Sequence, residues 1–477
     1  MDRDALRQLP PVGTVLEHAL LEPCKRARGR AAVLRAVRGA IAEARAAIQL
    51  GAAAAVDPES LARRSQQLLD SERASLRPVI NATGILLHTG LGRAPLAEEA
   101  IAAVSDVARG YCNLELDLEE GSRGRRTEGV ARLLCEATGA QAATAVNNNA
   151  GATILALKAL AAGREVIVSR GQLVEIGGSF RLPEILEVSG AILHEVGTTN
   201  KTRLSDFERA IGPRTAAILR VHPSNFRIVG FTEEPELAEL VALAHDRGLA
   251  LIDDIGSGAL GPGRPPGVCD EPTAAAGIAA GADLVLFSGD KLLGGPQCGI
   301  IAGTAQAVAQ VERDPLMRAL RLDKMTLAAL EATLLLACDA DRAASRIPLW
   351  SMIGAPVAAL SERATRLAVV FRDELGLNAA AVAAESYLGG GSAPVQPIPT
   401  AAVVVSPPFP IHLGSEAALA LALRRGDPPV VTRVQKGLVV FDLRTITEDR
   451  LPVLLDSVRK VCHDRNSQAT SDGPPYG

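Results

Sequence analysis

The sequence predicts an α/β protein with a mostly parallel central sheet, an N-terminal helical domain and a small α+β domain on the C-terminal side. Short apolar runs alternate with helical patterns between residues 166 and 287, which is the order expected of βαβ units. With 477 residues, 48% of them apolar, the chain exceeds one ordinary domain and can bury large cores. We expect an N-terminal domain at 1–75, a core at 76–325, a C-terminal domain at 326–464 and a disordered tail at 465–477.

Charge and cysteine usage narrow the functional class. The net charge of −4 predicts no general affinity for polyanions, so any contact with nucleic acid must come from a local patch. The seven cysteines include no CxxC pair, which indicates reduced thiols and argues against a disulfide framework or a zinc site. No apolar run reaches membrane-spanning length, and the N-terminus lacks the pattern of a signal peptide. We therefore expect a cytoplasmic protein with no membrane segment and no bound metal.

The first 75 residues have a helical pattern rich in Ala, Arg and Leu, with a basic stretch at 25–45. Within this stretch Glu43 is the one acid. Such a patch can bind phosphates, but no aromatic residues interleave it to stack on bases, so a solvated helix face is the alternative. In a linker-like segment, Asp57 can cap a further helix and Pro58 suits its first position. The basic residues are Lys25, Arg26, Arg28, Arg30, Arg35, Arg38 and Arg45.

The pattern of the core and the C-terminal region predicts individual elements. Core strands are expected at 166–169, 192–196, 216–221, 249–252, 284–287 and 299–303. Core helices are expected at 151–161, 204–210, 235–247 and 273–280. Towards the C-terminus, helices are expected at 327–344, 363–375, 415–425 and 451–461, and strands at 401–405 and 438–443. Because parallel strands end at one edge of the sheet, a ligand is expected beyond their carboxyl ends.

A lysine follows the strand predicted at 284–287, in the sequence LVLFSGDKLLGGPQCG. The amine of Lys291 would be partly shielded from water, which lowers its pKa, and the glycines around it would let a flat cofactor approach. A Schiff base with pyridoxal phosphate has these requirements. The alternative is a surface lysine in an ordinary loop, although only seven of the 50 basic residues are lysines.

Two acids, Asp253 and Asp254, close the strand predicted at 249–252. A carboxylate at the end of a central strand can keep the pyridine nitrogen of such a cofactor protonated, so that the ring accepts electrons. Asp is also a common helix cap, and two adjacent acids leave room for both roles. We favour Asp253 for the pyridine nitrogen.

Other segments reach the same edge of the sheet. Asn148, Asn149 and Ala150 precede the helix predicted at 151–161, where free backbone N–H groups and the helix dipole favour a phosphate group. A plain helix cap is the alternative. The glycine-rich residues 171–181 would pass over the cofactor ring. His222 ends another strand and is either a ring contact or a satisfied structural histidine.

Arg318 and Arg321 lie three residues apart in the sequence DPLMRALRLDK. On a helix, this spacing places both guanidinium groups on one face. Paired arginines suit an oxyanion such as phosphate. A solvated face or an interface salt bridge is the alternative.

Block after block, this sequence resembles the bacterial selenocysteine synthases, the L-seryl-tRNA(Sec) selenium transferases, which are fold-type-I pyridoxal-phosphate enzymes. The resemblance is highly specific from residue 77 to residue 324 and looser in the N-terminal and C-terminal regions. It implies the fold-type-I architecture for the α/β core. The matching blocks are NATGILLHTGLGRAPL, YCNLELDLEEGSRGRR, AVNNNAGATILAL, SRGQLVEIGGSFRLP, VHPSNFRIVGFT, LIDDIGSG, FSGDKLLGGPQCG and DPLMRALRLDK.

The resemblance implies conversion of seryl-tRNA(Sec) to selenocysteinyl-tRNA(Sec), with pyridoxal 5'-phosphate as cofactor and selenophosphate as selenium donor. Lys291 would hold the cofactor as an aldimine, loss of water would give aminoacrylyl-tRNA, and selenium would then add. Asp290 matches an active-site acid of the family that could assist proton transfer. The family's oxyanion-binding arginines match Arg93, Arg318 and Arg321.

The resemblance also bears on partners. The N-terminal domain recognises the tRNA in this family, which favours tRNA binding by Lys25, Arg26, Arg28 and Arg30. Family members form ring-like homo-oligomers built from dimers, with active sites at the dimer interface. Two other classes remain open. A pyridoxal-phosphate lyase acting on a small amino acid or sugar acid would share the core blocks, and a non-catalytic RNA-binding protein could retain a degenerate core.

Overall fold

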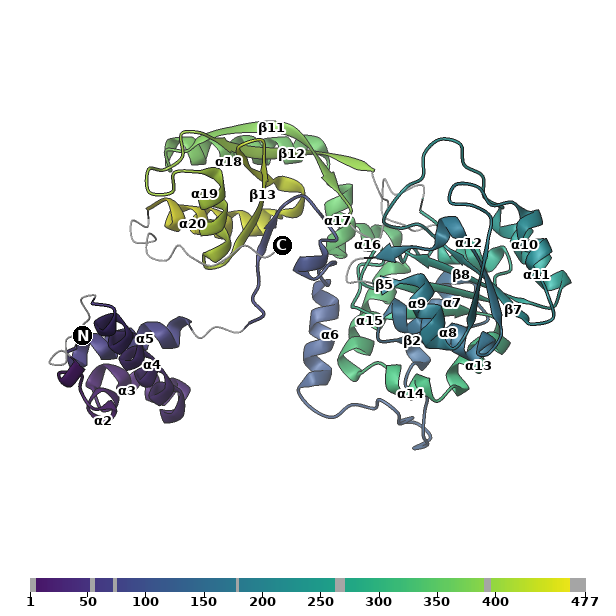
Figure 1. Cartoon of the computed structure of the whole chain (residues 1–477), viewed down its shortest axis with the longest axis horizontal. Coiled ribbons are helices and arrows are strands. Elements are labelled where there is room, and N and C mark those ends of the chain that lie inside the picture. Colours follow the sequence, from purple (N-terminus) through teal and green to yellow (C-terminus); the bar gives the residue numbers. More distant parts are fainter. Residues whose placement is uncertain are drawn as a thin grey trace. The chain divides into compact units, whose positions relative to one another are not determined.

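The computed structural model describes residues 6–51, 56–71, 75–176, 180–261, 271–389 and 396–463 (Figure 1). The chain divides into two compact units, Met1–Pro78 and Val79–Gly477. The tail predicted at 465–477 lies outside the described residues, as do residues 177–179 of the glycine-rich segment.

The first unit is helical. Along its longest helix, buried residues recur every three or four positions, from Val33 to Ala44, so that one apolar face packs against the neighbouring helices. The Ser60 N–H donates to Asp57 at 2.8 Å and Pro58 opens the next helix, which confirms both predictions. The described elements are α2 (Val12–Leu16), η1 (Ala19–Leu21), α3 (Glu22–Arg28), α4 (Arg30–Gln49) and α5 (Pro58–Ser71).

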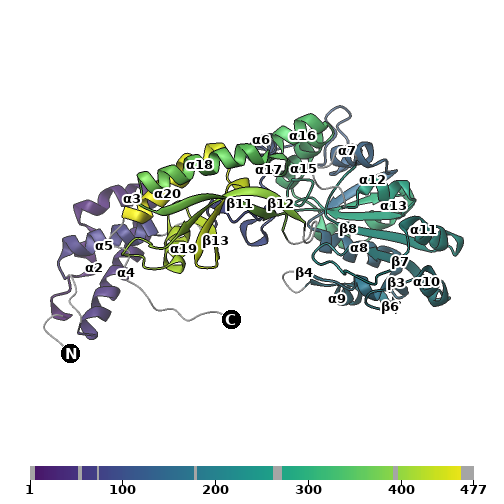
Figure 2. The same cartoon turned by 90° about the horizontal axis from the view of Figure 1, so that it is seen from above.

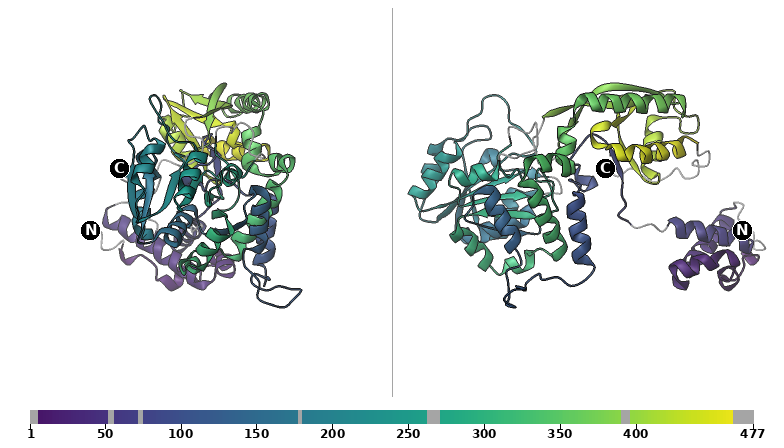
Figure 3. Two further views of the ribbon diagram at one scale, coloured as in Figure 1. Left: turned by 90° about the vertical axis from the view of Figure 1, so that its right-hand side faces the viewer. Right: turned by 180° about the vertical axis from the view of Figure 1, so that it is seen from behind.

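The second unit contains a seven-stranded sheet with helices on both faces (Figures 1 and 3). Within the described sheet, β10 alone runs antiparallel to its neighbours, β2 and β9, and the other pairs are parallel. The predicted, mostly parallel core is therefore confirmed. The strand order is β2 (Ala142–Val146), β10 (Gly299–Gly303), β9 (Leu284–Ser288), β8 (Ala250–Gly256), β7 (Thr215–Val221), β3 (Glu165–Ser169) and β6 (Ile192–Val196).

Each face of this sheet has its own hydrophobic core, because successive strand residues point to opposite faces. On β8, Leu251 belongs to one core, whereas Ile252 belongs to the other together with Leu284, its partner on β9. The first core is covered by α7 (Glu128–Thr138), α10 (Leu204–Ala210), α11 (Leu237–Asp246), α12 (Ala274–Ala279) and α15 (Lys324–Ala337). The second is covered by α8 (Asn149–Ala161), α9 (Leu182–Ser189) and α13 (Ala305–Arg313).

A five-stranded sheet forms the C-terminal part of the second unit. The helix α18 (Val357–Asp373) lies along β11 and β12, as Figure 2 shows, and α19 (Glu416–Arg425) and α20 (Leu451–His463) share its core. The strand β1 lies in the range predicted for the core domain, but it pairs in parallel with β13 of this sheet. The strand order is β1 (Ile80–Ala82), β13 (Val430–Gln435), β14 (Leu438–Asp442), β12 (Pro397–Ser406) and β11 (Asn378–Tyr387).

The helix predicted at 327–344 is two helices. The first, α15, ends at Ala337 and packs in the core, and Asp339 then caps α16 (Ala340–Arg346) by accepting hydrogen bonds from two backbone N–H groups. Among the described helices, none is both long and apolar enough to cross a membrane. The remaining elements are η2 (Thr89–Leu91), α6 (Glu98–Ala108), η3 (Arg170–Gln172), β4 (Glu175–Ile176), β5 (Phe180–Arg181), α14 (Leu316–Leu320), α17 (Pro348–Gly354), η4 (Leu443–Thr445) and η5 (Glu448–Arg450).

The segment after β1 runs from the C-terminal sheet to the core. Gly84 has a φ of +73°, and a Cβ there would lie 2.1 Å from an Asp442 carboxylate oxygen, so this position requires glycine. The Leu87 N–H then donates to the Leu388 carbonyl at 2.6 Å. These contacts fix residues 84–87, which precede Arg93 in the chain, against Asp442 and Leu388.

Candidate active site

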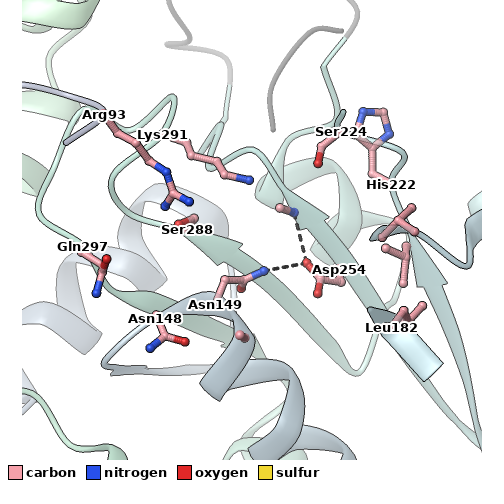
Figure 4. Close-up of a pocket in the computed structure, with 14 residues that line it drawn as sticks. Arg93, Asn148, Asn149, Leu182, His222, Ser224, Asp254, Ser288, Lys291 and Gln297 are labelled. Atoms are coloured by element: carbon pink, nitrogen blue, oxygen red, sulfur yellow. Dashed lines mark hydrogen bonds between the residues drawn. The ribbon is translucent and has the colours of Figure 1, made fainter. Parts of the chain in front are cut away.

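A cavity of about 250 Å³ lies at the carboxyl ends of β7, β8 and β9, beside the first turn of α8 (Figure 4). A ligand is expected at this edge of a parallel sheet. The cavity brings together the predicted site residues Arg93, Asn148, Asn149, Ala150, His222 and Lys291. Its lining also includes Asp254, Ser224, Ser288 and Gln297, and the apolar side chains of Val174, Leu182 and Val221.

Lys291 lies in the turn after β9 and is buried, with 6% of its surface exposed. In Figure 4 its amine points toward the end of β8. Burial lowers the pKa of the Lys291 amine from its ordinary 10.5, and the Arg93 guanidinium lowers it further. Three carboxylates act in the opposite direction, those of Asp254, Asp290 and Glu271.

The lysine turn is fixed against the loop that follows β8. The Leu292 N–H donates to the Ser257 carbonyl at 2.8 Å. Gly258 has a φ of +84°, and a Cβ there would lie 2.3 Å from the Ser288 carbonyl oxygen, so the two loops can approach this closely only with glycine. The backbone around Lys291 is therefore held by its neighbours.

The lowered pKa of Lys291 predicts a pH dependence of stability. The unfolded chain binds a proton on this lysine up to pH 10.5, whereas the folded chain releases it at lower pH. Between the two pKa values the unfolded state binds more protons, so the stability of the cofactor-free protein should rise with pH across this window. Denaturant unfolding from pH 7 to 10.5 should show this rise in the wild type and a smaller one in Lys291→Met. Equal slopes in the two proteins would contradict the lowered pKa.

Asp254, rather than the predicted Asp253, faces the cavity. Asp254 accepts hydrogen bonds from Asn149 Nδ2 and Thr153 Oγ1, both at 2.9 Å. Burial raises the pKa of Asp254, whereas these two hydrogen bonds favour its charged form. Asp253 lies on the opposite face of β8 and pairs with Arg220 at 2.9 Å. Because side chains alternate along a strand, Asp253 points away from the cavity that Asp254 lines.

The start of α8 forms one wall of the cavity. Asn148 caps the helix, because its Oδ1 accepts a hydrogen bond from the Gly151 N–H at 2.8 Å. Asn149 and Ala150 occupy the first turn, where backbone N–H groups have no helical acceptor and the helix dipole favours an anion. The Asn148 cap is therefore compatible with the predicted phosphate site at the backbone of this turn.

Arg93 and Asp290 form an ion pair beside Lys291. Arg93 donates to one Asp290 oxygen at 2.8 Å, and Ser288 Oγ donates to the other at 2.6 Å. Arg93 adopts a φ of +62°, which is uncommon for a residue with a side chain. Asp290 is 5% exposed, so the carboxylate that pairs with the Arg93 guanidinium is buried.

Arg318 and Arg321 lie outside this cavity, in a separate hollow of about 370 Å³. The helix α14 ends at Leu320, so the two arginines do not share a helix face as predicted, although both line the hollow. Three more arginines line it, namely Arg123, Arg125 and Arg126. Acids offset part of this charge, because Glu115 pairs with Arg126 at 2.6 Å and Glu312 with Arg125 at 2.5 Å.

The basic residues predicted to bind tRNA lie in α3 and at the start of α4. Lys25 pairs with Glu17 at 3.0 Å and with Glu22 at 2.6 Å, and Arg30 pairs with Glu17 at 2.9 Å. Arg28 donates to the Leu69 carbonyl at 2.7 Å, and Arg26 is exposed. Neighbouring acids therefore offset part of the positive charge of this patch.

Residues 79–447 match the family described as L-seryl-tRNA selenium transferase. The chain belongs to this family. It is 50% identical over 447 residues to the L-seryl-tRNA(Sec) selenium transferase of Moorella thermoacetica, covering 93% of this chain and 94% of that protein. The protein of the same name from Solidesulfovibrio magneticus is 46% identical over 467 residues, covering 96% and 99%.

Among solved structures, that of D-glucosaminate-6-phosphate ammonia-lyase has a TM-score of 0.57 and 20% identity, covering 83% of this chain and 97% of that one. This likeness is one of fold. The fold-type-I architecture predicted for this member of the selenium transferase family is confirmed.

Several polar residues that line the cavity or bond to its lining were not predicted, although the sequence carried signals for some of them. Thr153 lies one helical turn after Asn149, on the same face of α8. Ser288 stands two residues before Asp290, in the turn that presents Lys291. Ser224 stands two residues after His222, in the segment that ends the strand predicted at 216–221. Gln297 has no such neighbour, because its position depends on how the loop after Lys291 folds. Among the described residues, no group of three or more metal-ligating side chains could hold a metal ion.

Proposed function

We propose that this protein converts seryl-tRNA(Sec) to selenocysteinyl-tRNA(Sec), using pyridoxal 5'-phosphate as cofactor and selenophosphate as selenium donor. The single observation that carries this proposal is the cavity in which a buried lysine, a buried aspartate and a helix N-terminus converge. Two relatives that align over more than 90% of this chain carry the name L-seryl-tRNA(Sec) selenium transferase. A charged tRNA as substrate also favours a cytoplasmic location.

The residues of the cavity fit pyridoxal phosphate. Lys291 offers an amine whose pKa burial lowers, Asp254 offers a carboxylate for the pyridine nitrogen, and the first turn of α8 offers N–H groups for the phosphate. His222 lines the same cavity and would face the ring. When bound, the cofactor supplies an electron sink for breaking the Cα–H bond of serine.

The side chains around the cavity would carry out the proton transfer and bind the selenium donor. The Lys291 amine, whose pKa is lowered by burial, would take the Cα proton of the seryl group and return a proton later. Both oxygens of Asp290 accept hydrogen bonds, so we propose that Asp290 holds Arg93 in place, beyond the proton transfer predicted for it. Arg93 would bind the selenophosphate, whose phosphate leaves as selenium replaces the serine hydroxyl.

We propose that the active protein is a homo-oligomer built from dimers. Arg318 and Arg321 lie outside the cavity of their own chain, so a second copy would be needed to bring them to selenophosphate. The segment that carries Arg123 to Arg126 also exposes Tyr111 and Leu118, two apolar side chains suited to an interface. The N-terminal unit would bind the tRNA through Lys25, Arg26, Arg28 and Arg30.

Titration of the visible absorption band of the cofactor-loaded protein tests this function. An amine that reaches the cofactor at Lys291 changes the band, so seryl-tRNA(Sec) should shift it and free serine should not. A shift with free serine or another small amino acid, but none with seryl-tRNA(Sec), would instead indicate the lyase. Absence of any band in the protein incubated with pyridoxal phosphate would contradict the cofactor itself.

A further inference from the structure

The loop between β7 and α11 carries an exposed aromatic side chain that has no role in the reaction described so far. Phe231 is 82% exposed. The Lys201 amine lies 3.4 Å from the centroid of its ring, so one face of the ring makes a cation–π contact. Among the described residues, no second aromatic ring stacks on Phe231. The opposite face of the ring is therefore open to a ligand.

The backbone of Phe231 is fixed on the turn that follows β6. The Phe231 carbonyl accepts a hydrogen bond from Asn200 Nδ2 at 2.5 Å. Two residues later, the Glu233 N–H donates to the Asn200 carbonyl at 3.2 Å, and the Glu233 carbonyl accepts from the Thr202 N–H at 2.8 Å. Because these contacts hold the ring before a ligand arrives, little conformational entropy would be lost when one binds.

This loop connects the cavity to the turn after β6. It starts at His222 and Ser224, which line the cavity, and it reaches the turn at Phe231. In the sheet, β6 lies two positions from β7, and the parallel pairing of β7, β3 and β6 makes all three end at the same edge. With about 4.8 Å between neighbouring strands, the ends of β7 and β6 are about 10 Å apart. Phe231 thus lies beside the cavity, at the same edge of the sheet.

The size of the cavity limits what can enter it. Its volume of about 250 Å³ is below the roughly 300–1,000 Å³ of typical pockets for one small molecule. A bound cofactor and a seryl group would therefore leave no room for a nucleotide. The nucleotide that carries the serine must lie outside the cavity, at its edge, where an exposed ring can meet its base.

We propose that Phe231 stacks on the base of the unpaired 3′-terminal nucleotide of seryl-tRNA(Sec), while the serine esterified to it lies in the cavity. Every base has a π face, so an aromatic side chain can bind it without hydrogen-bond readout. Lys201 and Arg203 both pair with Glu233, at 3.6 Å and 3.3 Å, so positive charge beside the ring is offset. This favours contact with a base over contact with a phosphate. The inference deepens the proposed function and rests on it for the identity of the RNA.

The first test is filter binding of uncharged tRNA(Sec) to the cofactor-loaded full-length protein. Phe231→Ala should raise the Kd on the order of 10-fold, and Phe231→Tyr, which keeps the ring, should stay within about 3-fold of the wild type. Val229→Ala is the matched control. Val229 is 84% exposed on the same loop but has no π face, so the Kd should not change.

A truncated RNA shows which part of the tRNA the ring contacts. The wild type and Phe231→Ala should bind tRNA(Sec) without its unpaired 3′ nucleotides with Kd values within about 2-fold of each other, because the base that stacks is gone. An equal loss of affinity for the full and the truncated RNA in Phe231→Ala would overturn the proposal, as would an unchanged Kd for the full RNA.

Fluorescence reports the stacking itself. With 2-aminopurine as the terminal base of tRNA(Sec), binding to the wild type and to Phe231→Tyr should quench the emission, because stacking on an aromatic ring quenches this base. Binding to Phe231→Ala at saturating protein should leave the emission high. Equal quenching by Phe231→Ala and the wild type would overturn the proposal.

Sedimentation velocity of the same proteins separates this contact from an interface between copies of the chain. Phe231→Ala should form the same assembly as the wild type, and a smaller assembly would overturn the proposal in favour of an interface. If the wild type binds tRNA(Sec) no better than another tRNA, the proposed function fails and this inference fails with it. A wild type that prefers tRNA(Sec), with a Phe231→Ala variant that binds it equally well, would overturn the inference alone.

Discussion

Asp254→Asn should lower the rate of selenocysteinyl-tRNA(Sec) formation by on the order of 10²- to 10³-fold, whereas Asp253→Asn should leave it within a few-fold of the wild type. Asp254 faces the cavity and accepts hydrogen bonds from Asn149 and Thr153, so its carboxylate is fixed where the pyridine nitrogen is expected. An amide there cannot hold a proton on that nitrogen, and the cofactor then accepts electrons poorly. Asp253 lies on the opposite face of β8, where it pairs with Arg220.

The two neighbours serve as controls for each other. Asp253→Asn should reduce the free energy of unfolding by about 1–3 kcal/mol, because the Arg220 guanidinium loses its charged partner. Steady-state rates with seryl-tRNA(Sec), combined with denaturant unfolding of the same samples, measure both effects. If Asp253→Asn abolishes the reaction while Asp254→Asn retains it, the assignment made from the geometry of β8 is wrong.

The choice between these acids shows what the sequence can and cannot predict. The strand end, the lysine turn and the asparagine-rich helix start all follow from local patterns, and they do lie together at one edge of the sheet. However, β8 is buried on both faces, so its residues show no apolar–polar alternation from which a face could be read. Only its packing against α8 shows that the face shared by Ile252 and Asp254, rather than the face of Asp253, is the one that borders the cavity.

Long-range pairing explains the elements that local patterns missed. The strand β11 (Asn378–Tyr387) contains five alanines, which disfavour a strand, but it pairs with β12 over ten residues and packs against α18. The strand β1 has only three residues and forms by pairing with β13, about 350 positions later in the chain. Arg321 lies beyond the end of α14 because its backbone forms a bridge with Val146, which a helical spacing rule could not reveal.

Lys291→Ala should abolish covalent retention of the cofactor and reduce the rate of selenocysteinyl-tRNA(Sec) formation by at least about 10³-fold. The substitution removes both the attachment point and the base that would take the Cα proton. Incubation with pyridoxal phosphate, borohydride reduction and denaturing dialysis should leave the label on the wild-type chain and none on the variant. Lys158→Ala changes an exposed lysine of α8 and should behave as the wild type.

The position of the label also tests whether the cofactor binds in this cavity. Only seven lysines occur in the chain, and Lys291 is the one that lines the described cavity. A reduced label found on another lysine in Lys291→Ala, with activity retained, would show that the cofactor binds elsewhere. The roles of Asp254 and the α8 helix start would then fail with it. Loss of label and activity together, in a variant that still unfolds in one cooperative transition, would tie the reaction to the site where these three features meet.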